Sequence, residues 1–276
     1  AVEHYDGSSW TTATAIPTAT DNMGSCGTRT AGLIYGGATP GGNTNSTFEY
    51  DGSNWTAGGD LNTVRRTIVG AGTQTAALAA LGAIDPPFTA EAEQYNGSSW
   101  IQLGSDIGGE AANDRSGVSV SLSKDGKIVA IGANNNDGGD GHVRIYNYNG
   151  TSWVQLGSDI DGTTSDDTLG KSVAISDDGT VVAIGADGND DQGTNSGKAL
   201  VYHYHNNAWI QKGNTVKGNT YDRFGTSIDI NGEGDIIVVG AIYGKKQTSA
   251  TGNTYDYGYA RVFQRDDRSR CQEENL

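Results

Sequence analysis

Two short segments of the chain gather the oxygen-bearing side chains that a hard cation needs. Asn134–Gly141 reads Asn-Asn-Asn-Asp-Gly-Gly-Asp-Gly, and Asp187–Gln192 reads Asp-Gly-Asn-Asp-Asp-Gln. Carboxylate, amide and backbone carbonyl oxygens are the ligands that Ca²⁺ prefers. The side chains that would supply them are Asn134, Asp137, Asp140, Asp187, Asp190 and Asp191. A solvated turn rich in Asn, Asp and Gly explains the same residues and is the interpretation that the sequence favours.

A second kind of candidate is aromatic. Tyr255 and Tyr257 end the longest variable segment of the chain, Tyr243–Tyr257, and their rings are suited to stacking on sugars. Loops on a rigid scaffold often carry binding residues, so the variable segments are the expected ligand-binding regions. The other four segments are Thr39–Asn45, Ile84–Thr89, Asn134–Gly141 and Asp187–Gly197.

Catalytic signatures are missing from the sequence. The acidic pairs Asp166–Asp167 and Asp177–Asp178 are adjacent residues, which point to opposite faces of a strand and so make no dyad. His203 and His205 share a strand face and could chelate a metal, but ordinary exposed strand residues explain them better. There is no serine-nucleophile elbow, phosphate-binding loop or zinc signature. The sequence therefore predicts a protein that is not an enzyme.

The elements that would position these side chains are set by a recurring phrase. It begins as Tyr-Asp-Gly-Ser-Ser-Trp at 5–10 and returns in altered form four times, with spacings of 45, 45, 53 and 56 residues. Repeats of this length with strand-like segments indicate the blades of a β-propeller. Each indole is expected to fill the gap between neighbouring blades. The five tryptophans are Trp10, Trp55, Trp100, Trp153 and Trp209.

Each repeat predicts four short strands. In the second part of the chain, Gly117–Ala133, Gly170–Ala186 and Gly225–Ala241 each read as a hairpin with a tight turn rich in Asp and Gly. A tyrosine-bearing strand and a tryptophan strand follow, as at His142–Tyr148 and Ser152–Gly157. The small Gly-Ala pair that ends each hairpin suits the crowded axis of a propeller.

The predicted fold is all-β, a propeller of four-stranded antiparallel blades with five to six repeat units. Residues 1–267 are expected to form one domain and residues 268–276 a disordered tail. The strands of 1–14 are expected to supply the outer strand that the last unit lacks, which would close the ring; a piece of a larger propeller is the alternative. Closure would allow a disulfide between Cys26 and Cys271, and two unpaired thiols are the other possibility.

Composition restricts the partners. The 276 residues carry a net charge of −15, which disfavours nucleic acid and anionic lipid. No apolar run approaches the roughly 20 residues that span a bilayer, so membrane insertion is not expected. The chain opens on Ala1 without a visible signal peptide, as a processed protein or a fragment would.

The repeats resemble two known families. Residues 1–100, with Gly-Thr-Gln-Thr-Ala and Tyr-Asp-Gly-Ser-Ser-Trp, resemble kelch-like repeats of tail-fibre and other structural proteins of marine phages. Residues 101–265 resemble FG-GAP repeats of the integrin-α class, with Phe224–Gly225 as the literal Phe-Gly. Both families are propellers. Ile-Gly-Ala or Val-Gly-Ala stands where FG-GAP units have Gly-Ala-Pro, at 131–133, 184–186 and 239–241.

The resemblances imply a non-catalytic recognition or adhesion module, extracellular or on a virion surface, that binds a glycan or a surface protein of a host cell. A structural module that packs against other subunits of a fibre or virion is the first alternative, and a glycosidase or lyase on a propeller frame is the second. The calcium loop of FG-GAP units is not carried over, because short turns such as Ser123–Lys127 cannot wrap an ion that takes about 6–8 oxygens. No cofactor is expected, apart from calcium at the loops named above.

Overall fold

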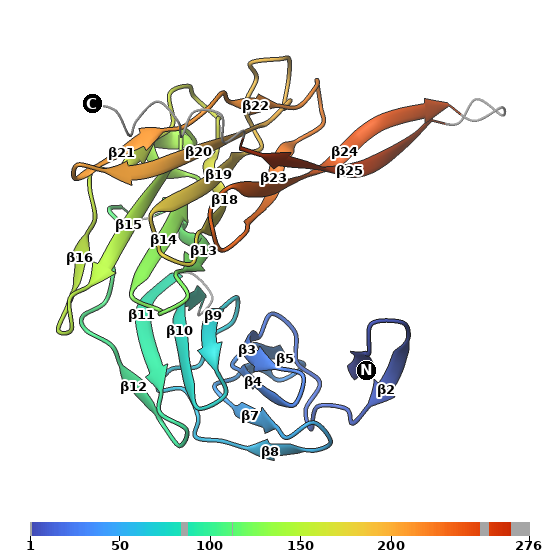
Figure 1. Cartoon of the computed structure of the whole chain (residues 1–276), viewed down its shortest axis with the longest axis vertical. Helices are drawn as coiled ribbons and strands as arrows, with labels where there is room; N and C mark the ends of the chain where they lie inside the picture. Colours follow the sequence, from blue (N-terminus) through green and yellow to red (C-terminus); the bar gives the residue numbers. More distant parts are fainter. Residues whose placement is uncertain (1, 84–87, 112, 249–253, 266–276) are drawn as a thin grey trace, which may run out of the picture.

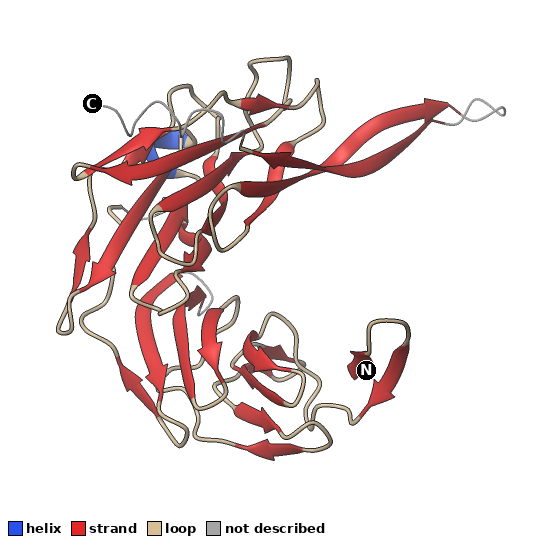
Figure 2. Ribbon diagram, in the orientation of Figure 1, coloured by secondary structure: helices blue, strands red, loops and turns tan. Residues whose placement is uncertain are grey.

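Strands make up almost all of the regular structure (Figure 2). The structure, a computed structural model, describes residues 2–83, 88–111, 113–248 and 254–265. Within these ranges the helical content is one short 3₁₀ turn, η1 (Asn136–Gly138), and no helix is long and apolar enough to cross a membrane. The prediction of an all-β fold built from small antiparallel sheets is confirmed.

The first hundred residues form two hairpins and two four-stranded sheets. The N-terminal hairpin pairs β1 with β2, and a smaller hairpin pairs β5 with β6. Sheet 1 has the strand order β3-β4-β7-β8, and sheet 2 has the order β12-β11-β10-β9. The strands are β1 (Val2–Tyr5), β2 (Trp10–Ala13), β3 (Gly24–Thr28), β4 (Ala31–Tyr35), β5 (Ala38–Thr39), β6 (Gly42–Asn43), β7 (Thr47–Tyr50), β8 (Trp55–Ala57), β9 (Val69–Thr73), β10 (Ala76–Ala83), β11 (Phe88–Tyr95) and β12 (Trp100–Gln102).

The rest of the chain forms three further sheets. Sheet 3 runs β13-β14-β15-β16 with β17 added to β15, and sheet 4 runs β18-β19-β20-β21 with β22 added to β20. Sheet 5 has three strands, β23-β24-β25. Their bounds are β13 (Ser116–Leu122), β14 (Ile128–Ala133), β15 (His142–Tyr148), β16 (Trp153–Gln155), β17 (Ile160–Asp161), β18 (Leu169–Ile175), β19 (Val181–Ala186), β20 (Lys198–His205), β21 (Ala208–Gln211), β22 (Val216–Lys217), β23 (Phe224–Ile230), β24 (Ile236–Thr248) and β25 (Thr254–Gln264).

The five sheets follow one another along an open arc, with the N-terminal hairpin at one end and sheet 5 at the other (Figure 1). The first strands of neighbouring sheets lie side by side. β3 of sheet 1 contacts β9 of sheet 2, and β18 of sheet 4 contacts both β13 of sheet 3 and β23 of sheet 5. Hydrophobic clusters between successive sheets form the core. This arrangement is consistent with a propeller.

The expected closure of the ring by the N-terminal strands is not formed. In the described residues β1 pairs with β2 alone, and β25 pairs with β24 alone. The N-terminal hairpin is held by sheet 1 instead: the His4 ring lies 5.5 Å from the Tyr50 ring, and Trp55 Nε1 donates to the Thr14 carbonyl. The arc is therefore open between the N-terminal hairpin and sheet 5 in the described residues.

The small residues near the inner strands are required by close approach between sheets. A Cβ at Gly132 would lie 2.1 Å from the carbonyl oxygen of Gly170 in the next sheet, and one at Gly185 would lie 2.1 Å from that of Gly225. The Ser119 hydroxyl also donates to the Gly170 carbonyl, at 2.7 Å. The expectation of a crowded inner edge is thereby confirmed.

Most of the tryptophans link neighbouring units. The indole N–H groups of four of them donate to the preceding unit: Trp55 to the Thr14 carbonyl, Trp100 to the Thr47 hydroxyl, Trp153 to the Leu103 carbonyl and Trp209 to the Leu156 carbonyl. Trp100 is 4% exposed and belongs to a core cluster. The expectation is wrong for Trp10, which is 66% exposed because no sheet precedes the N-terminal hairpin in the structure.

Two of the expected variable loops prove to be ordered strand or hairpin. Most of Tyr243–Tyr257 belongs to β24 and β25, which pair from Lys245 to Thr248 and extend well beyond the rest of sheet 5 (Figure 1). Thr39–Asn45 contains the β5–β6 hairpin, and Ile84–Thr89 falls partly outside the described residues.

The proposed disulfide is not tested by the structure. Cys271 and the predicted tail 268–276 lie outside the described residues. The Cys26 thiol lies 3.7 Å from the Thr73 carbonyl oxygen, and burial raises the pKa of this thiol to about 11. A pairing of Cys26 with Cys271 therefore stays a prediction.

Candidate functional site

A buried aspartate precedes the first strand of sheets 3, 4 and 5. These residues are Asp114, Asp167 and Asp222, each three positions before a glycine with positive φ at a β-bulge. A carboxylate removed from water is costly unless donors satisfy it. The repeated spacing Asp-x-x-Gly is a sequence signal for this feature that the sequence analysis did not use.

In sheets 4 and 5 the partner of the aspartate comes from the third strand of the same sheet. In sheet 4, Lys198 Nζ lies 2.7 Å from Asp167 Oδ2, and both side chains are buried. In sheet 5, the Tyr259 hydroxyl donates to Asp222 Oδ2 at 2.6 Å. These two aspartates thus fix the loop before the first strand to the third strand.

In sheet 5 the loop around the aspartate has a constrained backbone. Tyr221 and Arg223, on either side of Asp222, adopt φ values of 66° and 51°. Such values are uncommon for residues other than glycine and cluster at functional sites. Backbone hydrogen bonds hold both residues in place, from Tyr221 N to the Thr194 carbonyl and from Arg223 N to the Asn195 carbonyl.

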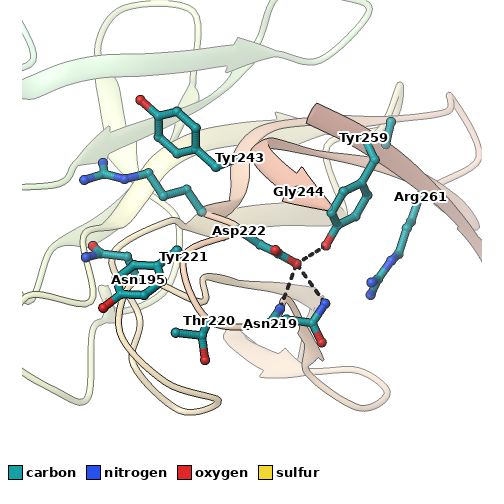
Figure 3. Close-up of a pocket in the computed structure, with 11 residues that line it drawn as sticks. Asn195, Asn219, Thr220, Tyr221, Asp222, Tyr243, Gly244, Tyr259 and Arg261 are labelled. Atoms are coloured by element: carbon teal, nitrogen blue, oxygen red, sulfur yellow. Dashed lines mark hydrogen bonds between the residues drawn. The ribbon is translucent and has the colours of Figure 1, made fainter. Parts of the chain in front are cut away.

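This loop forms one wall of a pocket of about 910 Å³ at the end of sheet 5 (Figure 3). Asn195 comes from sheet 4, residues 219–223 from the loop, Tyr243 and Gly244 from β24, and residues 259–261 from β25. Asp222 connects these parts. Its carboxylate accepts hydrogen bonds from the Tyr259 hydroxyl and from the backbone and side-chain nitrogens of Asn219, and its carbonyl accepts one from Tyr243 N.

Aromatic faces of the pocket are open to solvent. Tyr221 is 53% exposed and Tyr243 is 48% exposed. In Figure 3 both rings lie on one side of Asp222, and Arg261 lies on the other. Burial and the hydrogen bond to Asp222 raise the pKa of Tyr259 to about 12, which keeps its hydroxyl protonated as a donor.

Two guanidinium groups lie at the pocket. Arg261 stands over the Tyr259 ring, 4.8 Å from the ring centroid, and donates to the Lys217 carbonyl. Arg223 NH1 lies 3.7 Å from Asp187 Oδ2, and the Arg223 side chain is partly exposed. The pocket therefore combines aromatic rings, amide and hydroxyl groups, and positive charge on a chain of net charge −15.

The predicted oxygen ligands in the second acidic segment are engaged in internal bonds. Asp187 is buried and accepts from the Thr168 hydroxyl at 2.9 Å. Asp190 accepts from the backbone N–H of Asn195, which closes its own loop. Lys217 Nζ lies 2.8 Å from Asp191 Oδ2 and holds the pKa of Asp191 below its usual value.

The first acidic segment is less fully bonded. Asn134 is buried and Asp140 half-buried, and the Oδ1 atom of each has no hydrogen-bond partner in the described part of the chain. Asp137 is exposed in η1 with φ of 50°. The structure does not gather Asn134, Asp137 and Asp140 with the second segment into one group of ligands, so calcium binding there stays a prediction.

The two predicted sugar-stacking tyrosines lie on β25 and are not among the residues that line the pocket, although the backbone of Tyr257 is next to the lining residue Gly244. Tyr255 pairs with Gln247 and Tyr257 with Lys245. Tyr257 is exposed, whereas the side chain of Tyr255 is outside what the structure describes. Tyr221 and Tyr243 do line the pocket. Tyr243 begins the predicted binding segment Tyr243–Tyr257, whereas Tyr221 lies outside all the predicted segments.

Comparison with known proteins supports one of the two resemblances. No curated protein matches the chain, and the resemblance of residues 1–100 to kelch-like phage repeats stays a prediction. Residues 159–202 and 217–257 match the FG-GAP repeat. The first match covers β17, β18, β19 and most of β20, and the second covers β23, β24 and most of the residues that line the pocket. The chain therefore contains FG-GAP repeats within residues 159–257.

Proposed function

We propose that the chain is a β-propeller recognition module that binds a glycan in the pocket of sheet 5. The FG-GAP repeats and the succession of sheets support the propeller architecture. The observation that carries the binding function is the pocket itself, in which the exposed rings of Tyr221 and Tyr243 stand near guanidinium groups. Its volume of about 910 Å³ is in the range of small-molecule sites.

The chemistry of the pocket favours an acidic sugar. Tyrosine rings offer flat apolar faces to the C–H face of a sugar ring while their hydroxyls stay in water. The amides of Asn195 and Asn219 can exchange hydrogen bonds with sugar hydroxyls. The guanidinium groups of Arg223 and Arg261 match the geometry of a carboxylate. A uronic or other carboxylated sugar would use all three features.

We further propose that binding is not followed by catalysis and that the module acts outside a cell or on a virion surface. Glycoside hydrolysis ordinarily uses two carboxyl groups. Among the described residues that line the pocket, Asp222 is the one carboxylate, and its Oδ2 already accepts three hydrogen bonds. The proposed binding needs no cofactor.

Removing either pocket tyrosine should weaken glycan binding. We expect Tyr221→Ala and Tyr243→Ala each to lower the affinity for the best-bound oligosaccharide by about 10-fold, since one stacking ring contributes on the order of 1 kcal/mol or more. Titration calorimetry on the full chain measures this. Tyr5→Ala is the matched control, because Tyr5 is 49% exposed at the opposite end of the arc. Equal affinities for the wild type and both pocket variants would contradict the assignment of the site.

The uncovered face of sheet 5 favours a second candidate function, packing against another subunit. Val238 and Val262 are paired on this face, and Val262 is 69% exposed. The equivalent pair in sheet 3, Ala130 and Ile145, is at most 1% exposed because sheet 4 covers it. Among the described residues, no further sheet lies beyond sheet 5 along the arc.

The occupant that fits this face best is the N-terminal hairpin of a second copy. The hairpin exposes Tyr5 and Trp10, and the equivalent tryptophans of later units pack on the preceding sheet. Such a head-to-tail contact joins the face of sheet 5 in one copy to the N-terminal hairpin of the next, and contacts of this type can build rings or filaments. A module that packs into a fibre would be held together by this contact.

Light scattering after size-exclusion chromatography tests the packing candidate. We expect the wild type to show a mass above 28.7 kDa that rises with concentration, and Val262→Glu to remain a monomer. Val154→Glu, which places the same charge on another half-exposed valine, should behave like the wild type. A wild type that is monomeric at every concentration would rule this packing out.

A further inference from the structure

A second cluster of polar side chains lies on sheet 3, outside the pocket. Glu110, in the segment before β13, His142, at the start of β15, and Asp159, just before β17, bring their ligand atoms within 4.8 Å of one another. Imidazole nitrogen with carboxylate oxygen is a donor set used for Zn²⁺ and related ions. None of the three residues was a candidate in the sequence analysis.

His142 is the unusual member of the group. Its side chain is 2% exposed, so the imidazole is almost entirely removed from water. Its Nδ1 lies 3.7 Å from Glu110 Oε2, so the ring is aimed at the cluster. Burying a polar ring costs free energy, and an ion bound to the ring would offset that cost.

Comparison with the neighbouring sheets shows that the fold does not need a histidine here. His142 pairs with Ala133, as Lys198 pairs with Ala186 in sheet 4. Lys198 is used to satisfy the buried Asp167 of its own sheet. The ring of His142 has no corresponding role.

The buried aspartate of sheet 3 is satisfied by other groups. Asp114 Oδ2 accepts from the backbone N–H of Ala111 at 2.8 Å and from the Asn136 side chain at 3.5 Å. The position of Glu110, four residues before that aspartate, is taken by Thr163 in sheet 4 and by Gly218 in sheet 5. The group of three ligands is therefore particular to sheet 3.

Outer contacts hold the two carboxylates in place. Gln155 Nε2 donates to Asp159 Oδ1, which leaves the other oxygen of Asp159 for an ion. Arg144 NH1 lies 3.7 Å from Glu110 Oε1, the oxygen that is not directed at His142, and Arg144 also donates to the Gly108 carbonyl. Second-layer contacts of this kind orient the ligands of protein metal sites.

The surroundings are also strongly acidic. Asp161 is paired with His142 between β17 and β15, so it lies beside the group of three. The carboxylates of Glu110 and Asp159 lie close together beside one imidazole, and a bound divalent cation would relieve their mutual repulsion.

We propose that Glu110, His142 and Asp159 bind a divalent transition-metal ion, with Zn²⁺ as the best match. Three protein ligands leave a fourth position of a tetrahedral ion open to water or to a group of a bound molecule. Ligand atoms that share a zinc ion lie about 3–4 Å apart, and the 3.7 Å between His142 Nδ1 and Glu110 Oε2 is within that range. Calcium is a poor match because it takes oxygen ligands rather than imidazole.

Zinc titration of the full, untagged chain tests this site. After treatment with a chelator and dialysis, calorimetry with zinc chloride should show one ion per chain, and cobalt chloride should produce visible d–d absorption bands. Zinc should also raise the melting temperature, because an ion that binds the native state alone stabilises it. Glu110→Gln and Asp159→Asn should each weaken zinc binding by about 10-fold or more, as a lost contact of this kind does.

A control variant and three possible results decide whether the zinc site exists. Asp137→Asn removes a nearby exposed carboxylate outside the group of three and should bind zinc like the wild type. Both ligand variants alter side chains that are not fully buried, so folding should be preserved. The proposal is wrong if the wild type binds no zinc saturably, if both ligand variants bind as tightly as the wild type, or if calcium competes at equal concentration.

Discussion

Replacing Trp100 with alanine is expected to lower the free energy of unfolding by about 3–5 kcal/mol, the usual cost of removing a buried tryptophan. Trp100 is 4% exposed and packs with Tyr35 and Tyr95, with ring centroids 4.7 Å and 5.1 Å away. Its indole N–H donates to the Thr47 hydroxyl of sheet 1, so the substitution also leaves a polar group between the sheets without its partner.

The same substitution at Trp10 is the matched control. Trp10 occupies the equivalent place in the repeated phrase and stacks on Tyr5, but it is 66% exposed. We expect Trp10→Ala to change the unfolding free energy by less than about 1 kcal/mol, as most exposed substitutions do. Urea unfolding followed by circular dichroism measures both variants. Equal losses of unfolding free energy at the two positions would show that the tryptophan of the repeated sequence does not stabilise the protein by being buried between sheets.

The second large effect is expected at the buried ion pair of sheet 4. Lys198→Met should cost about 3–5 kcal/mol, because it leaves the buried carboxylate of Asp167 without its cation. Asn189 also donates to Asp167, at 2.7 Å, but an amide does not neutralise the charge. The loop before β18 would lose its tie to β20, within the region that matches the FG-GAP repeat.

The exposed pair Lys124–Asp177 has the same separation and is the control. Its N–O distance is also 2.7 Å, but the lysine side chain is 78% exposed. Surface pairs of this kind contribute about 0–1 kcal/mol, so Lys124→Met should have little effect in the same urea experiment. If the two lysine variants were equally stable, the buried aspartates would not be the structural anchors that we infer.

Much of the strand pattern could be predicted because it depends on local chemistry. The hairpin from Gly117 to Ala133 alternates apolar and polar residues around an Asp-Gly turn, and it forms β13 and β14 as expected. The predicted strand His142–Tyr148 is β15. The alternation of apolar and polar residues predicts individual strands, but it does not show whether the first and last strands of the chain pair with one another. The expected closure of the ring by residues 1–14 therefore had no support from the strand pattern.

The prediction of a loop at residues 243–257 is wrong, because most of these residues belong to the paired strands β24 and β25. Residues 243–257 contain glycine, threonine, lysine and asparagine without the alternation of a half-buried strand, which indicated a loop. Pairing across β24 and β25 satisfies the backbone there. Backbone pairing by itself does not require the alternation of apolar and polar residues by which a strand is predicted.

The candidate pocket could not be predicted because it is assembled from distant segments. Asn195, Asp222 and Tyr243 are brought together by the order of sheets 4 and 5. Two of the predicted variable segments, Asp187–Gly197 and Tyr243–Tyr257, do supply Asn195 and Tyr243. Nothing in the sequence indicates that these segments meet at one pocket. The repeated Asp-x-x-Gly spacing was available in the sequence and would have identified Asp222.

A glycan array probed with the purified chain tests the central claim, that this protein is a recognition module, most directly. It should be run once in buffer and once with a chelator. We expect selective binding to a small set of glycans that carry carboxylated sugars, and binding that disappears in the Tyr243→Ala variant. An array without binding in either buffer, with the chain shown to be folded, would contradict the glycan-binding function and leave packing against other subunits as the better account.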